Sequence, residues 1–384
     1  MASLFPDFTR REPNFSDKLR GLQWGLLFLL TAICCVGFAM LYSAANGQIQ
    51  PWASRQMVRF AIALGPMLVA ALIAIRYWYR AAYWIYGIAL LLVLAVDLRG
   101  VVGMGAQRWI DLGILQLQPS EVMKIAMLLA LARYFHAIGA ESSGRIGYVI
   151  PPVFMVLVPA VLVLKQPDLG TAIMLLANGA ILCFLAGVRL WMFAAAGIGA
   201  AALAPVAWSM LRDYQKNRLY TFLDPNLDPL GAGYHILQSK IALGSGGLFG
   251  KGFLQGTQSH LSFLPEKQTD FIFTMISEEL GLVGGLALLA LYVLVIAYGF
   301  AIALRSRNQF GRLLGLGIAS NFFLYVFINT AMVMGLIPVV GVPLPLISYG
   351  GTAMVTVLLG FGLLMNIGVH RDVRISRAGE GDSG

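Results

Sequence analysis

Long apolar runs, each close to the length that a helix needs to cross a lipid bilayer, recur along the whole chain. A membrane-spanning helix needs roughly 20 apolar residues, because each residue adds only about 1.5 Å to its length. The third and fourth runs are short, and the eighth is long enough to protrude. The sequence therefore predicts an all-α integral membrane protein with ten transmembrane helices, at 22–42, 57–75, 81–96, 119–135, 146–164, 170–186, 190–211, 271–304, 311–336 and 351–369.

Composition agrees with this fold class and argues against a soluble domain. Hydrophobic residues make up 59% of the 384 residues and charged residues only 12%, whereas soluble domains carry roughly 25% charged residues. We expect one transmembrane domain at 22–369, an N-terminal tail at 1–21 and a C-terminal tail at 370–384. The first apolar run is too long for a signal-peptide core, so we expect it to remain as an anchor.

One long connection, residues 212–270, separates the seventh and eighth helices. A loop of that length is usually functional or disordered, and the amphipathic stretch at 234–243 predicts order. Its glycine-rich part, 244–252, resembles a phosphate-binding loop only superficially, because Ser245 stands where the first glycine is required and Gly252 where a Ser or Thr is required. The glycines indicate loop flexibility or, alternatively, backbone contacts to a pyrophosphate.

The distribution of basic residues predicts the orientation. The formal net charge is +9, but Lys and Arg lie between apolar runs rather than in one stripe, which favours membrane orientation over nucleic acid binding. An even number of helices places both termini on one side. If that side is the cytoplasm, it holds fifteen of the 27 basic residues, and six of the other twelve lie in the long loop, which the positive-inside rule discounts. We therefore expect cytoplasmic termini and an outer 212–270 loop.

No pattern in the sequence indicates a metal-binding motif. Cys34, Cys35 and Cys183 lie inside apolar runs without a CxxC pair, and the four histidines do not form an HExxH motif. We therefore expect neither a disulfide nor a zinc site.

Placing a polar residue at membrane depth costs free energy, so each such residue calls for a structural or functional explanation. Arg108 is followed by Pro119, which suits a first helical turn, and by Glu121 and Lys124, which are i,i+3 neighbours on one helix face. The pair is either a self-satisfied ion pair that tethers helices or a site for a charged substrate. Asp168 follows a proline and precedes an apolar run, which favours a helix N-cap.

Asp270 lies where the long eighth helix is expected to begin. An acid at this position can stabilise a helix N-terminus. However, Glu278 and Glu279 enter the same helix, and three acids in so short a stretch exceed what capping requires. We therefore predict a functional carboxylate at Asp270.

Seven motifs are spread in order over nearly the whole chain: GAQRWI, QPSEVMK, KQPDLGTA, RLYTFLDP, GYHILQSKIALGSGGLFGKG, LPEKQTDFIF and VGVPLPLISYGGT. Together they resemble the motifs of the SEDS family of bacterial wall polymerases. The final motif is most similar to that of the elongation members of the family. Gln268 departs from the pattern, since many relatives have histidine there; this argues against a histidine role at that position, while Asp270 is kept.

The resemblance implies a peptidoglycan glycosyltransferase of GT-C-like membrane architecture in the bacterial cytoplasmic (inner) membrane. It would join lipid II molecules into glycan strands on the outer face during cell elongation. A class B penicillin-binding protein would cross-link the strands within an MreB-organised machine. No cofactor is required, and a divalent cation (Mg²⁺ or Mn²⁺) is an optional helper.

The resemblance and the polar clusters together define an expected site. Asp270 would act as general base on the acceptor 4-hydroxyl, with undecaprenyl pyrophosphate as leaving group and inversion at the sugar carbon. Cations near the outer face would offset the pyrophosphate charge. The residues expected to bind substrate are Arg108, Glu121, Lys124, Asp168, Arg218, Gln238, Lys240 and Ser348.

Two other functions fit parts of the same pattern. A lipid II flippase would explain charge inside the membrane, but it predicts a polar path through the bilayer, whereas the polar clusters lie at the outer ends of helices. A non-catalytic scaffold for the penicillin-binding protein would leave Asp270 and Lys124 replaceable. Small residues on the eighth and ninth helices predict a surface for that partner: Gly281, Gly284, Gly285, Gly311, Gly315 and Gly317.

Overall fold

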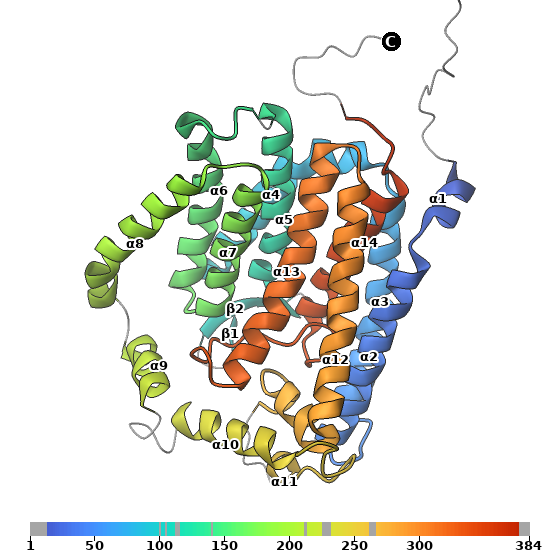
Figure 1. The fold of residues 1–384 in the computed structure, drawn as a ribbon, viewed down its shortest axis with the longest axis vertical. Coiled ribbons are helices and arrows are strands. Elements are labelled where there is room, and N and C mark those ends of the chain that lie inside the picture. Colours follow the sequence, from blue (N-terminus) through green and yellow to red (C-terminus); the bar gives the residue numbers. More distant parts are fainter. Residues whose placement is uncertain are drawn as a thin grey trace, which may run out of the picture.

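The computed structural model describes residues 14–99, 101–103, 106–111, 116–139, 141–210, 213–224, 232–260 and 266–375. These residues form a helical bundle with one small sheet (Figure 1). The helices and strands, in chain order, are α1 Phe15–Gly21, α2 Trp24–Ala44, α3 Trp52–Leu72, α4 Ile75–Arg99, β1 Val101–Gly103, β2 Ala106–Asp111, β3 Gln116–Leu117, α5 Pro119–Ile138, α6 Ile146–Lys165, α7 Leu169–Leu185, α8 Leu190–Met210, α9 Asp213–Leu223, α10 Ala232–Ser245, α11 Thr257–His260, α12 Ile272–Arg305, α13 Gln309–Val333 and α14 Gly351–Val369.

Each of the ten predicted spans coincides with one of the helices α2–α8 and α12–α14. Seven of these ten are long and apolar enough to cross a membrane: α2, α3, α4, α6, α12, α13 and α14. The third span was predicted too short, because α4 extends over 25 residues and includes an aromatic and basic first turn. The all-α membrane fold is thus confirmed, whereas the number of ten crossings stays a prediction.

Helices α5, α13 and α14 form the interior of the bundle. Their side chains are buried on most faces, and α3, α4, α7 and α12 pack around them (Figure 1). Small residues permit this packing: a Cβ at Gly315 would lie 2.8 Å from that of Ala303, and one at Gly317 would lie 2.9 Å from Leu128 and Leu182. The glycine face of α13 is therefore internal, and the hypothesis that Gly315 and Gly317 bind the partner is wrong.

The glycine-rich segment 244–252 packs against a break in α12. Gly281, with φ of +68°, interrupts that helix. The amides of Lys251 and Gly252 donate to the carbonyl oxygens of Glu278 and Glu279, both at 3.0 Å, and the amide of Leu282 donates to the oxygen of Gly247 at 2.9 Å. A Cβ at Gly246 or Gly250 would overlap the α12 backbone. The glycines thus permit backbone pairing, which neither of the two predicted interpretations anticipated.

The long connection is ordered at α10, as its amphipathic pattern predicted. The hydroxyl of Ser239 donates to the oxygen of Val333 at 2.8 Å and lies 2.9 Å from the hydroxyl of Thr274. This polar contact fixes α10 across the ends of α12 and α13. Together with α9 and α11, α10 lies at the end of the bundle opposite α1 (Figure 1).

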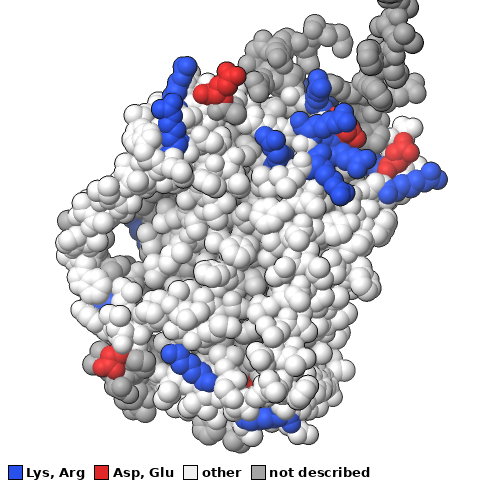
Figure 2. Space-filling view, viewed as in Figure 1, with Lys and Arg blue, Asp and Glu red and all other residues white. Residues whose placement is uncertain are grey.

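Both described ends of the chain meet at one end of the bundle. The Cα of Gly21 faces Val369, with 3.7 Å between an added Cβ and the Val369 side chain. Lys and Arg residues gather at this end, while the middle of the visible face carries almost none (Figure 2). The shared end agrees with an even number of crossings, and its assignment to the cytoplasm stays a prediction. Within the predicted 1–21 tail, α1 carries Lys18 and Arg20 beside exposed Phe15.

Candidate functional site

Asp270 lies in the turn that precedes α12, and its side chain is half-buried. The N-cap position of that helix belongs to Phe271, so Asp270 stands outside it. Asn329 of α13 donates from Nδ2 to the main-chain oxygen of Asp270 at 2.9 Å and to that of Val342 at 2.7 Å. The asparagine therefore links the turn that carries Asp270 to the segment that follows α13.

That segment, residues 339–350, which we call the Ser348 loop, packs directly on the Asp270 turn. The Ser348 hydroxyl donates to the oxygen of Thr269 at 2.6 Å and accepts from the amide of Leu344 at 2.8 Å. The amide of Tyr349 donates to the oxygen of Gln268, also at 2.8 Å. Ser348 is only 4% exposed, so in this structure its hydroxyl shapes the loop, and substrate binding by Ser348 stays a prediction.

Glycines bring the Ser348 loop close to its neighbours. A Cβ at Gly170, in the first turn of α7, would lie 2.6 Å from the oxygen of Val340, and one at Gly341 would lie 3.5 Å from Oδ2 of Asp270. The first of these contacts is closer than carbon atoms tolerate, so glycine is required there. The start of α7, the Ser348 loop and the Asp270 turn therefore form one continuous packed unit.

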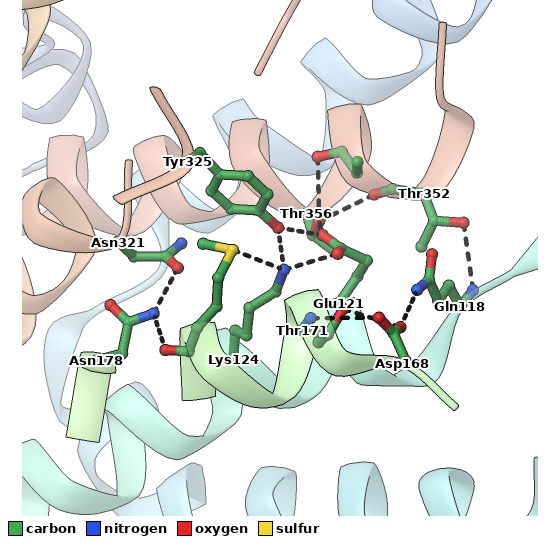
Figure 3. Close-up of polar contacts among 12 residues, drawn as sticks. Gln118, Glu121, Lys124, Asp168, Thr171, Asn178, Asn321, Tyr325, Thr352 and Thr356 are labelled. Atoms are coloured by element: carbon green, nitrogen blue, oxygen red, sulfur yellow. Dashed lines mark hydrogen bonds and ion pairs between the residues drawn. The ribbon is translucent and has the colours of Figure 1, made fainter. Parts of the chain in front are cut away.

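Glu121 and Lys124 form a buried polar cluster with Tyr325 (Figure 3). The ammonium of Lys124 lies 2.6 Å from Oε1 of Glu121 and also contacts the Tyr325 hydroxyl, which in turn donates to Oε2 of Glu121. Thr356 of α14 donates to the same carboxylate at 3.4 Å. Lys124 is 1% exposed. This arrangement fits the tethering interpretation, because the cluster joins α5, α13 and α14.

Asp168 caps α7, as its sequence context predicted. Its carboxylate accepts from the amide of Thr171 at 3.2 Å and from the hydroxyl of Thr171 at 2.9 Å. It also accepts from Nε2 of Gln118 at 3.1 Å, at the start of α5. Thr352 of α14 donates to the oxygen of Gln116 at 2.7 Å. The first turns of α5, α7 and α14 therefore meet in one polar region (Figure 3).

Arg108 approaches this region from a small antiparallel sheet that the sequence reasoning did not predict. Strand β2 pairs with both β1 and β3, in the order β1-β2-β3. The Arg108 guanidinium donates to the oxygen of Gln166 at 3.3 Å and to that of Pro167. These oxygens belong to the connection between α6 and α7, immediately before Asp168. Arg108 thus lies close to the predicted site, with part of its donor capacity already used.

The predicted residues of the 212–270 connection are less completely placed. Lys240 and Gln238 lie on α10, and the Lys240 side chain is exposed. Its Nζ approaches Gly335, 2.9 Å from an added Cβ, just beyond the end of α13. Arg218 is in α9, but its side chain lies outside the described residues. The structure thus places the Lys240 side chain beside the segment that follows α13.

Glu278 and Glu279 have structural partners. Glu278 Oε1 lies 2.7 Å from Nζ of Lys251 and accepts from the amide of Gln258 at 2.9 Å. Glu279 accepts from the hydroxyl of Ser43 at 2.6 Å and from the amide of Leu254 at 3.2 Å. The two acids therefore anchor the 244–258 segment onto α12. Their proximity in sequence to Asp270 was not evidence of a shared chemical role.

Three residues near the site escaped the sequence analysis: Asn329, Gln56 and Arg59. Gln56 is fully buried and donates to the oxygen of Ser348 at 2.9 Å. The Arg59 guanidinium lies 4.6 Å from the centroid of the Tyr349 ring. Gln56 and Arg59 are i,i+3 neighbours on one face of a predicted membrane helix, and that spacing was a usable signal.

The turn that carries Asp270 also carries a buried lysine, Lys267. Burial lowers the pKa of Lys267, three residues before Asp270, and the nearby Glu279 carboxylate opposes that shift. Within the described ranges, no three His, Cys, Asp or Glu side chains come close enough to hold a metal ion. A divalent cation at this site stays a prediction.

The fold and the site define a multi-helix membrane protein in which one half-buried carboxylate is held at the polar end of a packed helical interior. The chain belongs to the FtsW/RodA/SpoVE family of cell cycle proteins, whose model matches residues 21–373. This family is the SEDS family that the motifs resemble, so the family prediction is confirmed.

Individual relatives extend the similarity. The chain is 46% identical to the peptidoglycan glycosyltransferase MrdB of Escherichia coli K12, over 93% of this chain and 96% of MrdB. It is 34% identical to the stage V sporulation protein E of Bacillus subtilis, over 89% and 95% of the two chains.

Solved structures of other proteins are also similar to this chain over most of its length. One belongs to a peptidoglycan synthase complex that coordinates polymerization and crosslinking, with a TM-score of 0.79, 33% identity and coverage of 91% and 98%. The rod shape determining protein RodA of Thermus thermophilus gives a TM-score of 0.69, with 31% identity and coverage of 91% and 97%.

Proposed function

We propose that this protein is a peptidoglycan glycosyltransferase that polymerises lipid II on the outer face of the cytoplasmic membrane. The observation that carries the proposal is the position of Asp270. It lies in a turn held by Asn329, beside the Ser348 loop and at the end of the bundle opposite α1. Membership of the family and the names of its relatives support the same activity.

Asp270 acts as the general base. Its carboxylate takes the proton of the acceptor 4-hydroxyl while that oxygen bonds to the anomeric carbon of the donor sugar. The bond from this carbon to the pyrophosphate oxygen breaks, and both its electrons leave with undecaprenyl pyrophosphate. Attack from the opposite face inverts the anomeric carbon. One carboxylate suffices, because pyrophosphate needs no proton in order to leave.

Cations at the outer end offset the charge that develops on the pyrophosphate. Lys240, Arg108 and Arg218 serve this role directly, with Gln238 as a further polar contact. Glu121, Lys124 and Asp168 contribute by fixing the first turns of α5 and α7, since Glu121 and Lys124 pair with each other and Asp168 accepts hydrogen bonds from Gln118 and Thr171. A divalent cation, if bound, would supply further positive charge to the leaving pyrophosphate.

The partner is a class B penicillin-binding protein, which cross-links the strands within the MreB-associated elongation machinery. The support is the similarity to a chain of a complex that coordinates polymerization and crosslinking. Contact runs through exposed apolar side chains of α12 and α13 within the membrane. Both termini of the present protein face the cytoplasm.

Replacement of Asp270 by Asn tests the activity. The amide keeps the size of the side chain but cannot accept a proton at neutral pH, and loss of general base catalysis costs roughly 10²–10⁴-fold in rate. We expect folded Asp270→Asn protein to form almost no glycan from purified lipid II, with the partner present. Asp17→Asn, on exposed α1, is the matched control and should retain full rate.

Separate scoring of polymer and of lipid II translocation in vesicles discriminates the alternatives. Near wild-type polymer from Asp270→Asn would refute the proposed mechanism. Wild-type translocation without polymer would favour the flippase. Absence of both activities from the wild-type protein, with the partner still bound, would favour the scaffold.

A further inference from the structure

A pocket opens at the end of the bundle where the two described ends of the chain meet. It lies between the start of α2, the last turns of α12 and the end of α14. Its walls are formed by Gln23, Tyr298, Ala301, Ile302, Arg305, Gly368 and Arg371.

The pocket carries an excess of positive charge. Arg305 is exposed and makes no hydrogen bond or ion pair within the described ranges. Nε of Arg371 lies 3.4 Å from Oδ2 of Asp372, and Nε of Arg307 lies 3.2 Å from Oδ1 of the same carboxylate. Arg307 and Arg371 therefore share the Asp372 carboxylate, and Arg305 has no carboxylate partner among the described residues. The remaining positive charge is suited to an anion, and guanidinium groups match phosphate oxygens in geometry.

Contacts within the protein hold the pocket wall beside Arg305 and Arg371 in place. The Tyr298 hydroxyl donates to Oε1 of Gln23 at 3.0 Å, which closes the gap between α12 and α2. Gly368 permits a close approach, because a Cβ there would lie only 3.3 Å from Cγ of Gln23. Ile302 adds an apolar surface that is 5% exposed.

Apolar side chains continue from the pocket along the two helices. Trp24 is 55% exposed, beside Gln23, where an aromatic ring suits the boundary between lipid headgroups and hydrocarbon. Further along the same helices, Phe28 of α2 is 72% exposed and Leu294 of α12 is 53% exposed. A ligand that fits both the basic pocket and the apolar side chains along α2 and α12 has a phosphate at one end and long apolar chains at the other.

We propose that this pocket binds the headgroup of an anionic phospholipid, with its acyl chains lying along α2 and α12. Basic pockets between membrane helices are suited to such headgroups. The phosphate bridges Arg305 and Arg371, and Gln23 offers a further polar contact. Because these residues come from α2, α12 and the end of α14, the bound lipid joins three helices that are distant in sequence.

The test measures retention of phosphatidylglycerol or cardiolipin, against phosphatidylcholine, by native mass spectrometry of the purified full-length protein. We expect the wild-type protein to retain anionic lipid selectively. Arg305→Gln and Arg371→Gln should each weaken retention by roughly five- to tenfold, as expected for one basic residue at a lipid surface. Arg305→Lys, which keeps the charge but loses the planar fork, should show a smaller loss.

Arg76→Gln is the matched control, since Arg76 is exposed in the first turn of α4 and does not line the pocket. Equal loss of lipid from this control would show that overall surface charge, and not the pocket, attracts the lipid. Retention unchanged in both pocket variants would also overturn the proposal. Complete displacement by excess inorganic phosphate would assign the pocket to a soluble phosphate compound instead. None of these outcomes depends on glycosyltransferase activity.

Discussion

Asn329 holds Asp270 by its main chain, with 2.9 Å between Nδ2 of the asparagine and the carbonyl oxygen of the aspartate. One turn earlier on the same face of α13, Tyr325 belongs to the buried cluster with Glu121 and Lys124. A single helix face thus connects the interior ion pair to the proposed general base. Placement of the carboxylate therefore depends on packing deep in the bundle.

Asn329→Asp should reduce activity while the reactive carboxylate remains present. The substitution replaces a donor amide by an acceptor that faces two carbonyl oxygens, and each unsatisfied buried group costs about 1–3 kcal/mol. We expect a fall in kcat of roughly 10²-fold with little change in KM, because a small misplacement of a catalytic group has that effect. Rates of glycan formation at several lipid II concentrations measure both.

The neighbouring Thr330→Val is the control for Asn329→Asp. Among the described residues, the Thr330 hydroxyl donates to carbonyl oxygens of its own helix alone, at Val326 and Phe327, so its loss should be tolerated. A rate for Asn329→Asp equal to that of Thr330→Val would show that Asp270 does not need this support.

A double substitution separates the two interpretations of the Glu121–Lys124 pair. Lys124→Met alone leaves a buried carboxylate without its cation, which costs roughly 3–5 kcal/mol. Glu121→Gln combined with Lys124→Met removes both charges and should restore most of the thermal stability. If the pair only tethers helices, glycan formation should recover with stability. A stable but inactive double variant would show instead that the charges bind substrate.

The surface that binds the penicillin-binding protein should lie on the outward face of α13. Phe323 and Phe327 are 45% and 52% exposed, and their rings stack with centroids 5.7 Å apart. Phe327→Ala should therefore weaken co-purification of the partner while the fold is kept. Gly315→Leu should instead destabilise the protein, because its Cβ would meet Ala303 at 2.8 Å.

Phe154→Ala, on the exposed face of α6, is the control for partner binding. An undiminished yield of partner with Phe327→Ala would move the interface elsewhere. Equal losses from both phenylalanine variants would point to a general effect of membrane packing.

Reporter fusions test the orientation. A reporter placed after Arg377 should behave as cytoplasmic, and one inserted near Gln255, in the segment anchored on α12, should behave as external. The reason is the excess of Lys and Arg at the end of the bundle that carries α1 (Figure 2). The reverse pattern would place Asp270 on the cytoplasmic face and exclude an outer-face polymerase.

The sequence by itself determined the helical membrane fold, because the bilayer imposes a local requirement that each apolar run meets alone. It likewise predicted the Asp168 cap, the order of α10 and the family, since each depends on residues that are close in the chain or arranged in fixed motifs. Which face of each helix is buried, and which residues far apart in the chain contact each other, could not be predicted in this way. Both depend on which helices pack against one another.

Tertiary structure alone decided how deeply each polar residue is buried and which elements it packs against. Glu278 and Asp270 have similar sequence contexts, yet the fold buries Glu278 completely against Lys251 and holds Asp270 half-buried beside the Ser348 loop. Asn329 looked like an ordinary polar residue in an apolar helix, because its partners lie 59 and 13 residues away. Gly315 likewise could have faced lipid or the interior. Helix periodicity places residues on a common face, but only packing of the whole bundle determines what that face meets.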